Sequence, residues 1–96
     1  MHAVIRNYSG NGAKELFDVI EKNKAEVERA IRPVKGFVSY SIARTADGGF
    51  SVTVCQDKAG TDESVQAARD WIAKNAGSTG AAAPTISEGT VMLHLS

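Results

Sequence analysis

The order of strand-like and helix-like segments is the feature that most constrains the fold of this chain. Residues 2–8 and 37–45 alternate in the manner of strands, and residues 50–56 follow after the hairpin turn Asp47-Gly48-Gly49. Residues 13–31 instead carry apolar side chains at helical spacing. The first half of the chain therefore predicts a strand, a helix and a hairpin of two further strands.

The second half predicts one more helix and one more strand. Thr61 is expected to cap the helix and Gly77 to end it, as Asn11 is expected to cap the first helix. Residues 85–95 supply the last strand. The resulting β-α-β-β-α-β order favours an α+β, ferredoxin-like fold: a four-stranded antiparallel sheet with two helices on one face. With 96 residues, we expect a single domain, 1–96.

Side chains that alternate along a strand point to opposite faces of the sheet, so each predicted strand divides into two sets. We expect the aliphatic set beneath the helices: Ala3, Ile5, Val38, Ile42, Phe50, Val52, Val54, Val91, Leu93 and Leu95. The other set is mixed and contains no Lys or Glu: His2, Val4, Arg6, Tyr8, Phe37, Ser39, Ser41, Ala43, Ser51, Thr53, Cys55, Met92 and His94.

A domain of this size has a thin core, so a second covered face needs a partner. We therefore expect a homodimer in which the mixed faces of two sheets pack together. The alternative is a solvated face that merely lacks Lys and Glu.

The mixed face also carries the candidate site. His94 and Arg6 are expected on neighbouring strands, where an imidazole could deprotonate a phenol and a guanidinium could hold the anion, so these are the candidate catalytic residues. The substrate-binding candidates are Tyr8, Ser39, Ser41 and Cys55. The alternative is that all six are polar or small residues satisfied in a dimer interface. A lone strand cysteine is more often buried filler than a nucleophile.

Composition argues against several classes of function. Eleven Lys and Arg balance eleven Asp and Glu, so we expect no nucleic-acid partner. No apolar run approaches the ~20 residues of a membrane span, and we expect no membrane partner. One cysteine and an N-terminus without a signal pattern favour a cytoplasmic location. Two distant His and one Cys give no metal-ligand spacing.

Three segments resemble the antibiotic biosynthesis monooxygenase-like group of dimeric α/β-barrel proteins: VKGFVSY (34–40), RTADGG (44–49) and SVTVCQDK (51–58). In that group a Gly-Phe opens the second strand, and a hydrophobic strand ends in a short acidic-basic step before the second helix. The resemblance implies a homodimer that binds or oxidises a small aromatic or polyketide-like molecule in a cavity on the sheet. A non-catalytic ligand-binding or structural dimer is the alternative.

Some members of the group degrade haem with an Asn on the first strand, a Trp early in the second helix and a His further along it. Asn7 could match the first, but Trp71 lies late in its helix. No His occurs between Arg6 and Ala83, so the axial ligand is missing. We therefore expect neither haem nor any other cofactor, and we interpret Trp71 as packing at a helix edge.

Overall fold

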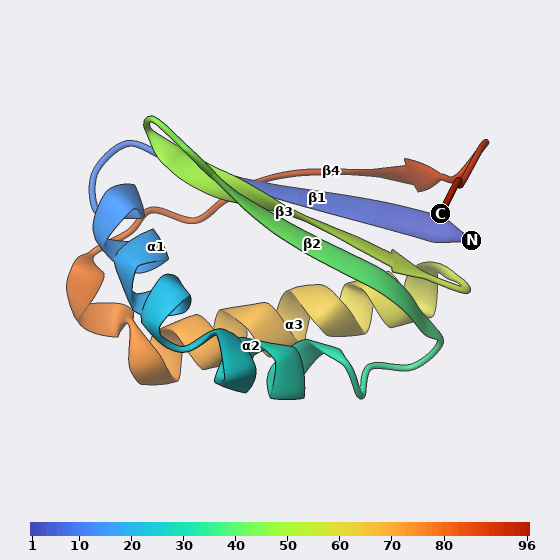
Figure 1. Cartoon of the computed structure of the whole chain (residues 1–96), viewed down its shortest axis with the longest axis horizontal. Helices are drawn as coiled ribbons and strands as arrows, with labels where there is room; N and C mark the ends of the chain where they lie inside the picture. The colour runs from blue at the N-terminus through green and yellow to red at the C-terminus, as the bar shows by residue number, and fades with distance from the viewer.

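The computed structural model describes residues 1–96, and its elements follow the predicted order. The strands are β1 (His2–Ser9), β2 (Phe37–Thr45), β3 (Gly48–Cys55) and β4 (Thr85–Thr90). The helices are α1 (Ala13–Lys22), α2 (Lys24–Ile31), α3 (Lys58–Asn75) and the short 3-10 helix η1 (Gly77–Thr79). The strands form one antiparallel sheet in the order β2-β3-β1-β4, and the α-helices all lie on one face of it (Figure 1). The α+β ferredoxin-like prediction is confirmed.

The helices differ from the prediction in three places. The N-cap of α1 is Gly12 rather than Asn11, and no side chain caps it. The first predicted helix is divided into α1 and α2 at Asn23, whose side-chain amide donates to the Val19 carbonyl at 2.8 Å. Such local side-chain bonds compete with the helical backbone pattern. The second helix begins at Lys58 rather than after Thr61, because the Asp57 side chain caps it by accepting from the Gly60 N–H at 3.1 Å.

Two glycines let the helices lie close to the sheet. A side chain on Gly49 of β3 would collide with the ring of Phe17 on α1. A side chain on Gly60 of α3 would collide with the Lys35 carbonyl oxygen and with Cβ of Cys55. The helix layer is therefore seated directly on the short side chains of β3.

The sheet turns the mixed set of β1 and β3 toward the helices, which is the reverse of the prediction. The buried side chains of β1 and β3 on this face are Val4, Arg6, Tyr8, Ser51, Thr53 and Cys55. Ile5 and Val52 belong to the predicted core set, but they point to the outer face, where Ile5 is 41% exposed. The physical reason is space: short side chains on β3 leave room for the helices and for the long side chains of β1.

A bulge changes the alternation of β2. Phe37 lies opposite Cys55 but Ser39 lies opposite Val54, so one extra residue is inserted between them. Residues directly opposite one another in an antiparallel pair share a face. After the bulge, Tyr40 and Ile42 face the helices, and the odd-numbered residues of the strand face outward. Ile42 is thus beneath the helices as predicted.

The last strand is shorter than predicted. β4 ends at Thr90 instead of continuing to 95, and the tail begins where the Val91 N–H donates to the Met1 carbonyl at 3.0 Å. The apolar side chains of this tail are exposed: Met92, Leu93 and Leu95. None of the helices is both long and apolar enough to cross a membrane.

Candidate functional site

The helix-covered face of the sheet holds a buried arginine that makes no ion pair. Arg6 is 3% exposed, and no carboxylate is bonded to it. Its Nη1 donates to the Tyr8 hydroxyl at 3.0 Å, and its Nη2 makes a longer contact of 3.5 Å with the Tyr40 hydroxyl. Its Nε has no partner. A buried charge is unfavourable unless it is paired, so Arg6 is a cation that lacks its anion.

Other buried polar atoms near Arg6 also lack partners. The Ser51 Oγ has none, and Ser51 lies directly opposite Arg6 on β3. The Nε1 of Trp71, on α3, has none either, and the Trp71 side chain lines the same space as Arg6 and Ser51. Most buried polar atoms in proteins are hydrogen-bonded. Several buried polar atoms without partners around one recess are typical of a site that binds a ligand or water.

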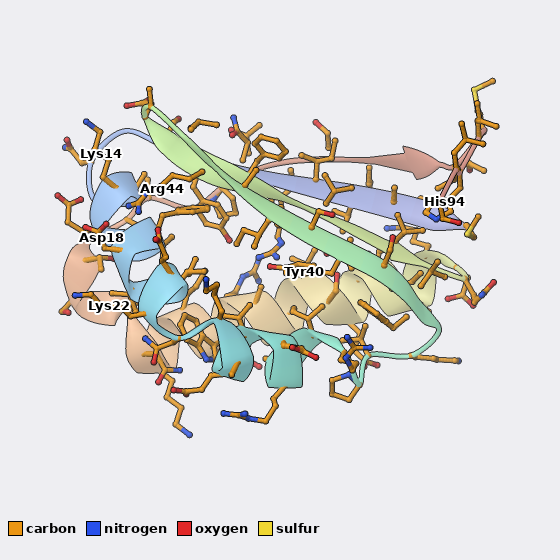
Figure 2. The ribbon with its side chains drawn as sticks, viewed as in Figure 1. Lys14, Asp18, Lys22, Tyr40, Arg44 and His94 are labelled. Carbon is orange, nitrogen blue, oxygen red and sulfur yellow. The ribbon has the colours of Figure 1, made fainter.

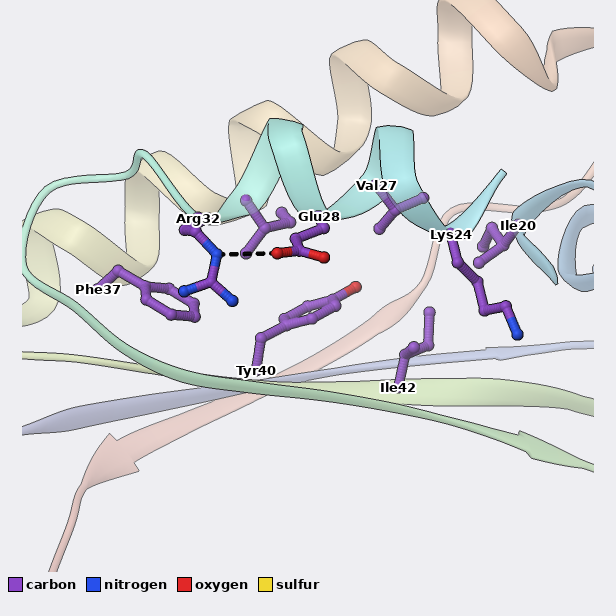
Figure 3. A pocket seen from close by; sticks show the side chains of 9 residues that line it. Ile20, Lys24, Val27, Glu28, Arg32, Phe37, Tyr40 and Ile42 are labelled. Carbon is purple, nitrogen blue, oxygen red and sulfur yellow. Dashed lines mark hydrogen bonds and ion pairs between the residues drawn. The ribbon is translucent and has the colours of Figure 1, made fainter. Parts of the chain in front are cut away.

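The space between helices and sheet has two adjoining parts. A recess of about 20 Å³ is lined by Arg6, Tyr8, Tyr40, Ser51 and Trp71 together with apolar side chains of the helices. A chamber of about 250 Å³ lies between α2 and β2 (Figure 3). The two share five lining residues: Ile20, Val27, Ile31, Tyr40 and Ile42. The polar recess is therefore the inner end of a mainly apolar chamber.

Charged side chains of α2 line the outer part of the chamber. Glu28 accepts from Nε of Arg32 at 3.0 Å, and the Arg32 guanidinium also lies 5.7 Å from the centre of the Phe37 ring (Figure 3). Lys24 lines the chamber without an ion pair. The only carboxylate of the chamber is thus neutralised, and the remaining charge is positive.

A third cavity, of about 350 Å³, adjoins Arg6 and Tyr8 on the β4 side. Arg6, Tyr8 and Ile72 line both this cavity and the recess, so the two spaces adjoin at Arg6. The walls are mostly apolar: Leu16, Val65, Ile72, Ala73, Ala81, Ala82, Ala83, Pro84 and Ile86. Arg69 adds a second cation to this cavity, which has no carboxylate.

Two groups beneath the helices have altered acidity. Burial raises the pKa of Tyr40, and the neighbouring charge and hydrogen bond of Arg6 oppose this rise only in part. Tyr40 is therefore a neutral phenol at neutral pH. Burial, with the charges of Asp57 and Glu63, raises the pKa of Cys55. Cys55 lies at the end of β3 against Gly60, as a protonated packing residue rather than a nucleophile.

The structure brings Arg6 and Tyr8 together as predicted and separates them from other predicted site residues. Ser39 and Ser41 were expected on the same face, and this is wrong because the bulge in β2 turns them outward. Cys55 shares the covered face but lies opposite His2, at the other end of β1 from Tyr8.

The expected pairing of His94 with Arg6 is also wrong. The residue opposite Arg6 on β4 is Ile86, and β4 ends before His94 is reached. His94 is exposed in the tail, at the end of the molecule where the chain termini lie, whereas Tyr40 lies between sheet and helices (Figure 2). A proton acceptor at the Arg6 site therefore does not come from His94 of the same chain.

Three members of the site are not predicted from the sequence. The bulge in β2 places Tyr40 on the same face as Arg6, which simple alternation along the strand does not predict. Trp71 is interpreted above only as packing at a helix edge, although its Nε1 has no partner. The sequence predicts Ser51, with Arg6, on the face away from the helices, whereas the structure buries both beneath the helices. The available signal is the absence of Lys and Glu from the set that contains Arg6 and Ser51, since a strand face without them is a covered one.

Metal and haem sites can be compared with these residues. No group of three or more His, Cys, Asp or Glu is placed to hold a metal ion. The recess and the two cavities are lined by no histidine, the residue type that the haem-degrading proteins of the resembled group use as axial ligand. The lining does not fit haem held in that way.

No protein-family model matches this sequence, and no curated protein matches it. Solved structures share its fold. The protein NE2512 of unknown function from Nitrosomonas europaea has a TM-score of 0.69 at 11% identity, over 98% of this chain and 90% of that one. A variant of MhuD with two manganese protoporphyrin IX molecules per active site has a TM-score of 0.65 at 19% identity, over 99% and 97%.

A monooxygenase from the gene ActVA-Orf6 of Streptomyces coelicolor, in complex with nanaomycin D, has a TM-score of 0.61 at 17% identity, over 98% of this chain and 88% of that one. At these identities the likeness concerns the fold. The expected resemblance to monooxygenase-like proteins with the dimeric α/β-barrel fold is confirmed at that level.

Proposed function

From a fold shared with monooxygenase-like proteins, we propose that this protein binds a small aromatic or polyketide-like molecule between helices and sheet, and oxidises it without a cofactor. The observation that carries the proposal is the buried, unpaired Arg6 at the inner end of an apolar chamber. Small-molecule sites are typically concave and mostly apolar, with a few polar groups that set orientation.

The lining residues support specific roles. Arg6 would stabilise negative charge on a ring oxygen, because a preorganised guanidinium in a dry site interacts strongly with an oxyanion. The neutral hydroxyl of Tyr40 and the unpartnered Nε1 of Trp71 are further donors at the same recess. Apolar side chains of α1 and α2 would hold the rings and exclude water.

Binding can be tested with the single tryptophan of the chain, since Trp71 lines the recess. Hydroxynaphthoquinones should quench Trp71 fluorescence with saturation. We expect Arg6→Gln to weaken binding about tenfold or more, because hydrogen bonds to a charged group contribute roughly 1.5–3 kcal/mol. The control, Arg29→Gln, removes an exposed arginine of α2 and should leave binding unchanged.

Oxygen uptake measured with the same compounds separates the two functions that the sequence leaves open. Oxygen uptake that is lost in the Arg6→Gln variant supports the enzymatic function. Saturable binding without oxygen uptake by any compound would favour a ligand-binding protein. If no compound quenches Trp71, the proposed site is wrong.

We also propose that a second copy of the chain covers the outer face of the sheet. That face is uncovered in the single chain and carries apolar side chains in its middle, among them Ile5, Phe50 and Val52. Burying such a patch in a symmetric dimer removes apolar surface from water. The homodimer thus stands as a proposal, with the aliphatic face in place of the mixed one as its interface.

A further inference from the structure

Resting on the proposed function, we infer that the ligand binds as an anion that has lost its proton beforehand, with its charged oxygen in the recess beside Arg6 and its apolar body in the chamber. The inference names the substrate class: acidic phenols, hydroxyquinones and enols. It follows from the charge balance around Arg6, from the lack of a suitable proton acceptor at the recess and from the size of the recess.

The charge balance requires a negative group. Arg6 is covered on every side, yet its protein partners are two hydroxyls, and its Nε is unpartnered. The other cations along the cavities are Lys24, Arg32 and Arg69, and the single carboxylate, Glu28, is paired with Arg32. A neutral ligand would leave the charge of Arg6 uncompensated. An anion would compensate it through charge-assisted hydrogen bonds to the guanidinium.

No group around the recess is suited to take a proton from a neutral ligand near pH 7. The groups that β1, β2 and β3 direct toward Arg6 are the hydroxyls of Tyr8, Tyr40 and Ser51, and burial keeps Tyr40 protonated. From α3 comes the indole of Trp71, which is only a donor. On β4 the carboxylate is Glu88, which is engaged by His2 and Lys58.

Glu28 on α2 is the remaining carboxylate, and it lies in the chamber rather than in the recess. Its carboxylate is held by Arg32 at 3.0 Å on the exposed side of the chamber, away from Arg6. The proton must therefore be lost in solution, and binding then selects the ionised form.

The recess is large enough for about one oxygen atom of a ligand. Its volume of about 20 Å³ is close to the ~10–15 Å³ that a single water needs. The adjoining chamber of about 250 Å³ lies just below the ~300–1,000 Å³ of typical small-molecule pockets, which suits a ligand of one or two rings. An oxyanion in the recess would lie among Arg6, Tyr40 and Trp71, with the ring between α2 and β2 (Figure 3).

The test uses two matched pairs of probes: para-nitrophenol with para-nitroanisole, and juglone with its methyl ether. Each phenol changes its visible absorption on ionisation, and each ether cannot ionise. At a pH one unit below the phenol's own pKa, about nine-tenths of the free phenol is protonated. We expect added protein to generate the phenolate absorption. Below that pKa, the apparent affinity for the phenol should increase about tenfold for each unit by which the pH is raised, because the ionised fraction increases by the same factor.

Variants connect this signal to Arg6. In Arg6→Gln the phenolate absorption should disappear, in Arg6→Lys it should partly return because the charge is kept, and in the control Arg29→Gln it should be unchanged. The ethers should bind more weakly than the phenols and should be insensitive to Arg6→Gln.

The inference is overturned if a phenol quenches Trp71 without any phenolate absorption, or if an ether binds as tightly as its phenol. Either result leaves the proposed binding site in place. If neither the four probes nor the hydroxynaphthoquinones quench Trp71, the proposed function itself fails, and the inference fails with it.

Discussion

At the scale of the residue, Arg6 is the side chain whose environment is hardest to explain by stability alone. It is enclosed under the helices with hydroxyls for partners and with one nitrogen left without any. Removing a charge from water is unfavourable by several kcal/mol unless the protein compensates it. A residue retained there for folding would have a carboxylate beside it, as exposed Arg44 has in Asp18.

Arg6→Met should therefore stabilise the free protein. The flexible methionine fills similar space without a buried charge, so we expect the free energy of unfolding in urea to rise by about 1–3 kcal/mol. The matched change at an exposed position, Arg29→Met, should stay within about 0.5 kcal/mol of the parent. A clear loss of stability in Arg6→Met would instead make the Tyr8 and Tyr40 contacts structural.

At the scale of the element, the position of α3 determines the shape of the recess, because this helix carries Trp71. Its N-terminal end is seated where Gly60 lies against the Lys35 carbonyl and Cys55. The Asp57 cap directs the first turn, and the hydroxyl of Thr61 donates to the Lys58 carbonyl at 3.1 Å. The buried residues of α3 are all small, and they therefore set the distance between this helix and the sheet: Gly60, Thr61, Ser64 and Ala68.

Gly60→Ala tests this seating. The added methyl group meets a backbone carbonyl, which cannot move as a flexible side chain can, so we expect a loss of about 1–3 kcal/mol in unfolding free energy and a shifted Trp71 emission spectrum. Gly77→Ala is the matched control, because Gly77 has open space around its Cα. Equal stability of the two variants would contradict the close approach of α3 to the sheet.

At the scale of the whole molecule, the chain has one covered and one uncovered sheet face. The covered face is partly polar because it contains the candidate site, and the uncovered face carries the aliphatic side chains of β1 and β3. A single chain with this distribution exposes apolar surface that a second copy could bury. The tail after β4 adds further exposed apolar side chains near the N-terminus.

Ile5→Lys examines the proposed homodimer. The charge would be buried without a partner between two sheets, so we expect the variant to sediment as a monomer at micromolar concentration while the parent sediments as a dimer. Ala25→Lys adds the same charge on the exposed surface of α2 and should remain dimeric. A parent protein that is monomeric at this concentration, or an Ile5→Lys variant that dimerises as the parent does, would rule out this interface.

The order of the elements, the presence of a hairpin between β2 and β3 and the bounds of β2 follow from the sequence alone, since these depend on local periodicity and turn chemistry. The turn itself is Ala46-Asp47 rather than the predicted Asp47-Gly48-Gly49, because Thr45 pairs with Gly48 and both glycines belong to β3, which begins at Gly48 instead of residue 50. The sequence also divided β1 and β3 correctly into two sets of side chains. Alternation cannot say which of two sets is covered, because the pattern is the same whichever face the helices pack on.

The covered set is determined by how the helices pack on the sheet. The helices lie on the face whose β3 side chains are short, and this brings Arg6 and Tyr8 inside rather than Ile5. The residue inserted by the bulge in β2 then turns Tyr40 toward the site and Ser41 away from it. The early end of β4 removed His94 from the site, because the ladder between β1 and β4 ends at the pair of His2 and Thr90, where β1 itself begins.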